Sequence, residues 1–225
     1  MLVTTNRTAQ ANAVRTPNLS PLIRVVDDEA TIQTLFERIG QLCGYDVECH
    51  GTAESYLSAV ENDRPGCLVL DLMLPDRSGI EVLQEVRERG YRLPVVFVSG
   101  MARVSEAVQA LKLGSVDFVE KPFDIQQIAD VLRRAVELDM QARSHHAEDD
   151  ELRRRFDALT RRENQVMEQV VRGAANKEVA AKLGLSHKTV EVHRANVMRK
   201  TQANSLAELV RMHVAVHPEP ALQNA

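Results

Sequence analysis

Five side chains with the chemistry of a phosphoryl-transfer site follow or end four separate apolar runs of the chain. They are two adjacent carboxylates, a third carboxylate, a hydroxyl and an ammonium: Asp27, Asp28, Asp71, Ser99 and Lys121. A carboxylate can act as a nucleophile, and an ammonium and a hydroxyl can hold the oxygens of the group that it accepts. Each residue alone is typical of a turn or a solvated surface, so the prediction depends on a fold that brings all five together.

The run before Asp71 has the composition of a buried strand. Residues 68–70 are apolar, without the polar alternation of a half-exposed strand, and Pro75 and Gly79 mark a loop after them. Open α/β sheets bind ligands at the carboxyl ends of their strands. Asp71 could also do no more than cap the next turn, because turn carboxylates are common.

Strand-like and helix-like segments alternate through residues 21–138. The strand-like runs are residues 22–26, 45–49, 68–70, 95–98 and 116–120, and the segments with helical spacing are residues 31–43, 52–61, 78–89, 104–111 and 125–138. This alternation requires parallel strands, right-handed crossovers and helices on both faces. The sequence therefore predicts a doubly wound α/β domain with the polar strand ends on one edge. Three carboxylates together need a compensating cation, and oxygen ligands favour Mg²⁺.

Charge is distributed unevenly along the chain. Residues 1–151 contain 15 Lys and Arg against 25 Asp and Glu, whereas residues 152–216 contain 13 against 6. An acidic part joined to a basic part indicates two functions, the second involving a polyanion. Aromatic residues make up only 4% and Trp is absent, which argues against a surface that stacks sugars or single-stranded nucleic acid.

Other patterns exclude several classes of protein. The three cysteines lack metal-ligand spacing, and no run of 18 apolar residues predicts a membrane span. The first 20 residues are polar and lack the apolar core of a signal peptide. We therefore expect a cytoplasmic protein with reduced thiols and no membrane partner, which begins with a disordered extension.

Asp27-Asp28, Asp71, Ser99 and Lys121-Pro122 resemble, in type and spacing, the receiver domain of bacterial two-component response regulators. The resemblance covers about residues 21–140. It implies a flavodoxin-like receiver fold in which Asp71 accepts a phosphoryl group from a sensor histidine kinase. Ser99 and Lys121 would then bind that group.

The same resemblance implies a metal site and a switch. Asp27, Asp28, Asp71 and the backbone carbonyl of Met73 would bind Mg²⁺. Ser99 and Phe118 would form the switch, although ordinary core packing also explains Phe118. Residues 99–103 differ from the commoner Thr-Gly-His-Gly-Asp of the FixJ-type group, which affects the switch loop and leaves the chemistry intact.

Residues 156–217 read as a small, basic, all-α unit of four helices. Capping boxes begin the first helix at Thr160 and the fourth at Ser205, while Asn176 and Ser186 are expected to cap the second and third. We interpret Glu163 as a structural member of the first box. Two short helices joined by a glycine turn predict a helix-turn-helix that binds DNA.

The third helix carries the candidate DNA contacts. Segments 159–163, 176–180 and 185–194 resemble the LuxR-type helix-turn-helix. That resemblance implies a recognition helix and a fourth helix that serves dimerisation. The candidate residues are Lys188, Thr189, Glu191, His193, Arg194 and Lys200. A solvated amphipathic face is the rival interpretation, and Val190 either packs in the core or contacts a thymine methyl.

Together the two resemblances imply a FixJ/NarL-type response regulator, which is not an enzyme apart from the phosphorylation and dephosphorylation of Asp71. Its expected parts are an extension (1–20), a receiver (21–138), a solvated linker (139–155), the DNA-binding domain (156–217) and a tail (218–225). Its expected partners are the kinase, double-stranded promoter DNA, RNA polymerase and a second copy when phosphorylated.

Two rival functions remain at this stage. A haloacid-dehalogenase-type phosphatase would carry a second Asp two residues after the nucleophile, where this chain has Met73. An orphan regulator would use the acidic pocket only as structure and bind DNA constitutively. For the main interpretation, we expect Ser99 and Lys121 to reach the phosphoryl group only if their strand ends move inward. That movement would shift a dimerisation face at residues 103–113 and 116–120.

Overall fold

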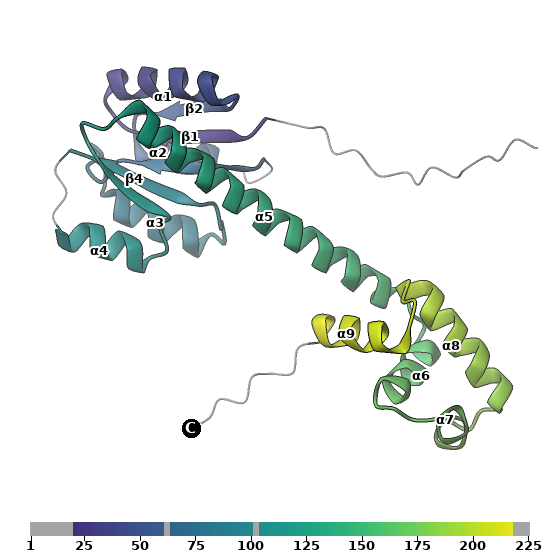
Figure 1. Cartoon of the computed structure of the whole chain (residues 1–225). Helices are drawn as coiled ribbons and strands as arrows, with labels where there is room; N and C mark the ends of the chain where they lie inside the picture. Colours follow the sequence, from purple (N-terminus) through teal and green to yellow (C-terminus); the bar gives the residue numbers. More distant parts are fainter. Residues whose placement is uncertain (1–19, 61–63, 101–103, 218–225) are drawn as a thin grey trace, which may run out of the picture. The chain divides into compact units, whose positions relative to one another are not determined.

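A computed structural model describes residues 20–60, 64–100 and 104–217 (Figure 1). The chain divides into two compact units, the first ending at Gln141 and the second beginning at Ala142. Most of the expected extension, residues 1–19, lies outside the described residues, and so does the expected tail at residues 218–225.

The first unit is built on a five-stranded parallel sheet. Its strands are β1 (Leu22–Val26), β2 (Asp46–His50), β3 (Gly66–Leu70), β4 (Val95–Ser99) and β5 (Asp117–Glu120). They are ordered β2-β1-β3-β4-β5, which places the reversal of strand order between β1 and β3. That position is the ligand-binding switch point of a doubly wound sheet. The predicted fold class is confirmed.

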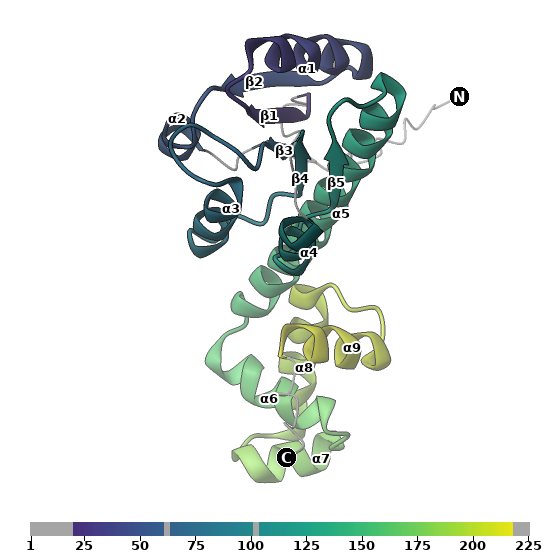
Figure 2. The same cartoon turned by 90° about the vertical axis from the view of Figure 1, so that its left-hand side faces the viewer.

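Helices cover both faces of this sheet (Figure 2). They are α1 (Ala30–Cys43), α2 (Ala53–Ala59), α3 (Gly79–Glu88), α4 (Val104–Lys112) and α5 (Ile125–Asp157). α1 and α5 pack on one face around Phe36 and Leu132, whereas α2, α3 and α4 pack on the other around Tyr56 and Leu83. All residues of β1, β3 and β4 are buried, as expected for strands covered on both sides.

The helix α5 is much longer than the sequence predicted. We expected it to end at residue 138 and to be followed by an irregular linker at residues 139–155, but these residues are helical. No glycine or proline interrupts α5, and the pair formed by Glu151 and Arg155 is spaced to stabilise a helix. The prediction was wrong because charged residues without an apolar face give no periodic signal.

The second unit contains the end of α5 and four further helices. These are α6 (Arg161–Val171), α7 (Asn176–Leu183), α8 (His187–Thr201) and α9 (Leu206–Val216). The predicted box at Thr160 forms, because Glu163 Oε2 accepts the Thr160 N–H at 2.8 Å. Asn176 is not the cap of α7, since Ala175 holds that position and Asn176 is the first helical residue. Val190 is fully buried, which settles it as a core residue.

Candidate functional site

An acidic pocket lies at the carboxyl ends of β1 and β3. The ladder holds it in place, because the Asp27 N–H donates to His50 O at 3.0 Å and the Asp71 N–H donates to Val26 O at 2.9 Å. Carboxylate oxygens of Asp27, Asp28 and Asp71 lie within 4.8 Å of one another. Across the described ranges, this is the one group of three or more such side chains with metal-binding spacing.

The two adjacent acids differ in exposure. Asp27 is 2% exposed and Asp71 is 6% exposed, whereas Asp28 faces solvent. Desolvation raises the pKa of Asp27 above its ordinary value, although hydrogen bonds from Lys121 and from the Glu29 N–H oppose that change. The pocket therefore combines buried negative charge with access from water.

Lys121 supplies the compensating charge. Its Nζ lies 2.7 Å from Asp27 Oδ2, 2.8 Å from Asp71 Oδ2 and 2.9 Å from Glu29 Oε1. Desolvation acts to lower the pKa of Lys121, but these three hydrogen bonds raise it well above the ordinary value. The Lys121 ammonium thus already contacts Asp71, while its expected contact with a phosphoryl group stays a prediction.

Glu29 is a pocket residue that sequence reasoning left unassigned. Its carboxylate contacts Lys121 from the solvent side, and its N–H donates to Asp27 Oδ1 at 2.9 Å. The signal was available, because Glu29 directly follows the two acids after β1. Its role depends on the position of the Lys121 ammonium, which no local pattern provides.

The two switch candidates occupy different surroundings. Ser99 is the last residue of β4 and is 1% exposed, and its carbonyl accepts the Lys121 N–H at 2.9 Å. Phe118 is half-buried on β5, with its ring centroid 6.4 Å from that of Phe97. Arg103, at the start of the expected switch face, lies outside the described residues.

The segment after Asp71 folds back past it. The Met73 N–H donates to Asp71 Oδ1 at 3.0 Å, and the Gly79 N–H donates to Leu72 O at 2.9 Å. A Cβ on Gly79 would lie 2.1 Å from Asp71 O, so this position requires glycine. Met73 is thereby held beside the pocket with an exposed side chain.

These groups fit a hard divalent cation and a phosphoryl group. The clustered ligand atoms are all carboxylate oxygens, which suits Mg²⁺ better than a softer metal. Asp71 offers a nucleophilic oxygen next to an ammonium, and the side chains of Asp71 and Lys121 are only 7% and 11% exposed.

The predicted DNA contacts lie on α8. Lys188 is exposed, and the Glu191 carboxylate lies 3.4 Å from His187 Nδ1. The Thr189 hydroxyl is 2.7 Å from that of Ser186, the N-cap of α8. His193 and Arg194 are half-buried. The Arg194 guanidinium donates to Asn176 Oδ1 at 3.0 Å.

Two residues of α8 differ from what the sequence indicated. Lys200 Nζ lies 2.7 Å from Glu163 Oε2 and 3.0 Å from Ala158 O, so its ammonium joins α8 to α6. Val192 was not singled out, yet its side chain is 54% exposed on α8. Val190 and Val197 are buried one heptad apart, whereas Val192, two positions after Val190, lies on the opposite side of the helix.

Comparisons with known proteins agree with both units. Residues 23–133 match the family model described as response regulator receiver domain, and residues 157–213 match that of the luxR family of bacterial regulatory proteins. No helix among the described residues is long and apolar enough to cross a membrane.

Several relatives and a solved structure align with most of this chain. The chain is 37% identical to the response regulator protein TodT of Pseudomonas putida over 85% of this chain and 84% of that protein. It is 41% identical to the transcriptional regulatory protein FixJ of Azorhizobium caulinodans, over 88% and 94%. A structure of the response regulator StyR aligns with a TM-score of 0.81 at 34% identity, covering 86% of this chain and 98% of that one.

The fold and the two family matches define a receiver joined to a LuxR-type helix-turn-helix domain. The chain belongs to the response regulators of two-component systems, in the group that contains FixJ and TodT. It is a phosphorylation-dependent transcriptional regulator, a class that requires a histidine kinase and DNA as partners.

Proposed function

We propose that Asp71 is the residue that accepts the phosphoryl group and that Ser99 and Lys121 bind it there. The observation that carries this proposal is the contact between Lys121 Nζ and the carboxylates of Asp27 and Asp71. A phosphoryl group adds about two negative charges. It can therefore bind the Lys121 ammonium, which contacts both acids in this structure. The chain itself would have no substrate to turn over apart from its own phosphoryl group.

The proposed cofactor is Mg²⁺, held by Asp27, Asp28, Asp71 and the Met73 carbonyl. The mutual distances of the three carboxylates support it. Bound Mg²⁺ would neutralise oxygens of the incoming phosphoryl group. The residues of the chain orient that group, because the Asp71 carboxylate is fixed by Lys121 on one side and by the Met73 N–H on the other.

Phosphorylation is proposed to act through a two-fold dimer of the receiver. The exposed apolar side chains of α4 support an interface there: Val104, Val108 and Leu111. Phe118 lies next to this region on β5 and, with Ser99, would couple it to the pocket. Two copies would match two DNA half-sites about one helical turn apart and would raise affinity without new base contacts.

We propose that α8 binds promoter DNA through its exposed polar face, in the cytoplasm and together with RNA polymerase. The residues are Lys188, Thr189, Glu191, His193 and Arg194, while Lys200 is retained only as a phosphate contact that would have to leave Glu163. The proposed receiver spans residues 21–138 and the DNA-binding domain residues 156–217. The segment between them is a helical linker.

Labelling of the purified full chain tests the proposal. A small phosphodonor with Mg²⁺ should add one phosphoryl group to Asp71, detected by intact mass and peptide mapping. The Asp71→Asn variant keeps the shape of the side chain without its nucleophilic charge and should not be labelled. Equal labelling of both proteins, or continuous turnover of a phosphate ester, would reject the assignment.

A further inference from the structure

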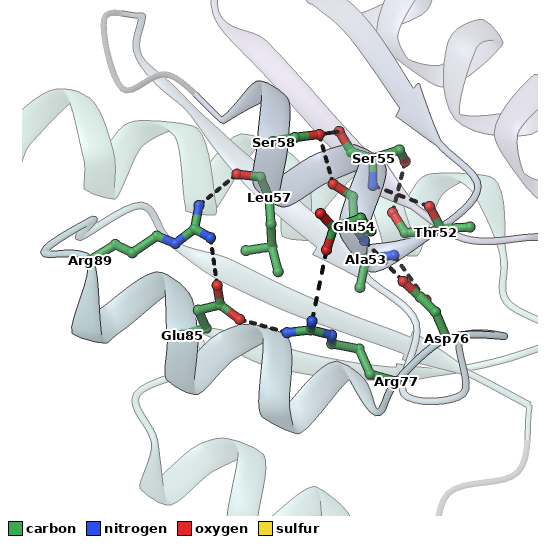
Figure 3. Close-up of polar contacts among 10 residues, drawn as sticks. All are labelled: Thr52, Ala53, Glu54, Ser55, Leu57, Ser58, Asp76, Arg77, Glu85 and Arg89. Atoms are coloured by element: carbon green, nitrogen blue, oxygen red, sulfur yellow. Dashed lines mark hydrogen bonds and ion pairs between the residues drawn. The ribbon is translucent and has the colours of Figure 1, made fainter.

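A loop aspartate joins the segment after Asp71 to a neighbouring helix. Asp76 follows Pro75 in the loop between β3 and α3, and both of its carboxylate oxygens accept backbone N–H groups of α2 (Figure 3). Oδ1 is 3.1 Å from Ala53 N, and Oδ2 is 2.9 Å from Glu54 N. These are the first two residues of α2, whose amides have no partner within the helix.

The aspartate therefore caps a helix from a distant part of the chain. The N-cap of α2, Thr52, uses its own hydroxyl for a different amide, that of Ser55 at 3.2 Å. Desolvation acts to raise the pKa of Asp76, but the hydrogen bonds from Glu54 and Ala53 lower it below the ordinary value. Asp76 is thus a charged cap, which interacts favourably with the amino end of a helix.

A second set of contacts ties α2 to the same segment of the chain, at Glu54 near the start of the helix and at Leu57 farther along it. Arg77 contacts Glu85 of α3 and lies 3.9 Å from the carboxylate of Glu54 (Figure 3). Arg89 donates to Leu57 O at 2.6 Å and also contacts Glu85. The segment from Asp76 to Arg89 therefore contacts α2 at its first residues and again at Leu57.

The loop between β3 and α3, which Asp76 anchors to α2, carries one of the proposed metal ligands. Met73 precedes Asp76 by three residues and pairs with Ser78 across the loop in an isolated bridge. Contacts within the loop and to Asp71 fix its inner side. Asp76 provides its anchor on the outer side, at a helix outside the pocket.

We infer that Asp76 is a positioning residue for the metal site, which holds the Met73 carbonyl in place by anchoring the β3–α3 loop to α2. The inference rests on the proposed function of the pocket. It assigns Asp76 no contact with the metal or the phosphoryl group. Loss of the anchor should weaken metal binding, while the Asp71 carboxylate keeps its contact with Lys121.

The test is Mg²⁺ affinity, measured by calorimetry on the full chain. Asp76→Ala should weaken binding about fivefold, the factor expected if the loss of one helix cap is fully transmitted to the ligand. Asp76→Asn keeps one uncharged oxygen that can accept one of the two N–H groups, so its Mg²⁺ affinity should fall less. At saturating Mg²⁺ the labelling rate of both variants should return to that of the unmodified chain.

Thr52→Ala is the matched control, because it removes a cap of the same helix without releasing the loop. Its Mg²⁺ affinity should stay within about twofold of the unmodified chain. Equal weakening by Thr52→Ala and Asp76→Ala would reduce Asp76 to a stabiliser of α2, and unchanged affinity in Asp76→Ala and Asp76→Asn would overturn the inference. If Asp27→Asn also leaves Mg²⁺ affinity unchanged, the proposed metal site itself has failed.

Discussion

The acidic pocket and the exposed face of α8 are built in opposite ways. In the pocket, buried charges from β1, β3 and β5 meet, and each depends on the others: Lys121 alone contacts three carboxylates. On α8, the candidate residues come from one helix: Lys188 and Glu191 face water, and the others are half-buried. Removing one pocket residue should therefore disturb the whole pocket, whereas removing an exposed residue of α8, such as Lys188, should change only its own contact.

This difference separates stability from recognition. A buried ion left without its partner costs far more than an exposed one. In α8 the stabilising residues include Val190, which is buried in the core of the second unit, and Lys200, which is paired with Glu163 of α6. The exposed residues of α8, such as Lys188, are thereby available to a partner without a loss of folding stability.

The largest effect on stability should come from Lys121→Met. Without the ammonium, the buried Asp27 and Asp71 carboxylates repel each other, and the first unit should lose about 3 kcal/mol of unfolding free energy. Added Mg²⁺ should restore most of that loss. Urea unfolding with and without Mg²⁺ measures both effects. The exposed Lys112→Met is the control, and a loss no larger than its own would show that the pocket is not coupled as described.

A smaller effect should distinguish two valines of α8. Val190→Ala removes a fully buried side chain and should cost the second unit about 2 kcal/mol. Val192→Ala should leave thermal unfolding unchanged but weaken binding at sites that present a thymine methyl to the helix. If Val192→Ala destabilised the domain as much as Val190→Ala, the two faces of α8 would not be separate.

The pH dependence of the second unit follows from one buried carboxylate. Hydrogen bonds from Lys200 and the Thr160 N–H lower the pKa of Glu163 from 4.5 to about 2. Because the folded pKa lies below the unfolded one, this stabilisation is complete above about pH 4.5 and is lost as the pH falls toward about 2. The Tm of Glu163→Gln should start lower at neutral pH and vary less over that window. The exposed Glu191→Gln should follow the unmodified chain, and a parallel pH profile for Glu163→Gln would contradict the assignment.

The smallest effect should come from Lys188→Ala. If Lys188 neutralises one phosphate, the slope of log affinity against log salt should flatten by roughly 1, without a change in folding. If it reads a guanine edge, the preference at one base pair should relax instead. Arg211→Ala, on the exposed side of α9, is the control. Equal affinities and preferences for Lys188→Ala and the unmodified chain would make this face a solvated one.

Sequence predicted the strands and the pocket residues because both leave local marks. Apolar runs that end in Asp27, Asp71 and Ser99 locate the strands and the edge at once. The continuous α5 left no such mark, because its second half has charges in place of an apolar face. The roles of Glu29 and Asp76 depend on contacts with residues far along the chain, which spacing alone does not provide.

The most direct test of the central claim couples the two units in one measurement. DNA binding of the full chain is measured with and without beryllofluoride and Mg²⁺, for the unmodified chain and for Asp71→Asn. The DNA is a duplex enriched from a random pool by binding to the unmodified chain. Sedimentation of the same samples reports the oligomeric state. We predict that beryllofluoride raises both affinity and dimer content in the unmodified chain and neither in Asp71→Asn. An equal rise in affinity in both proteins, or none in either, would contradict a switch operated through Asp71.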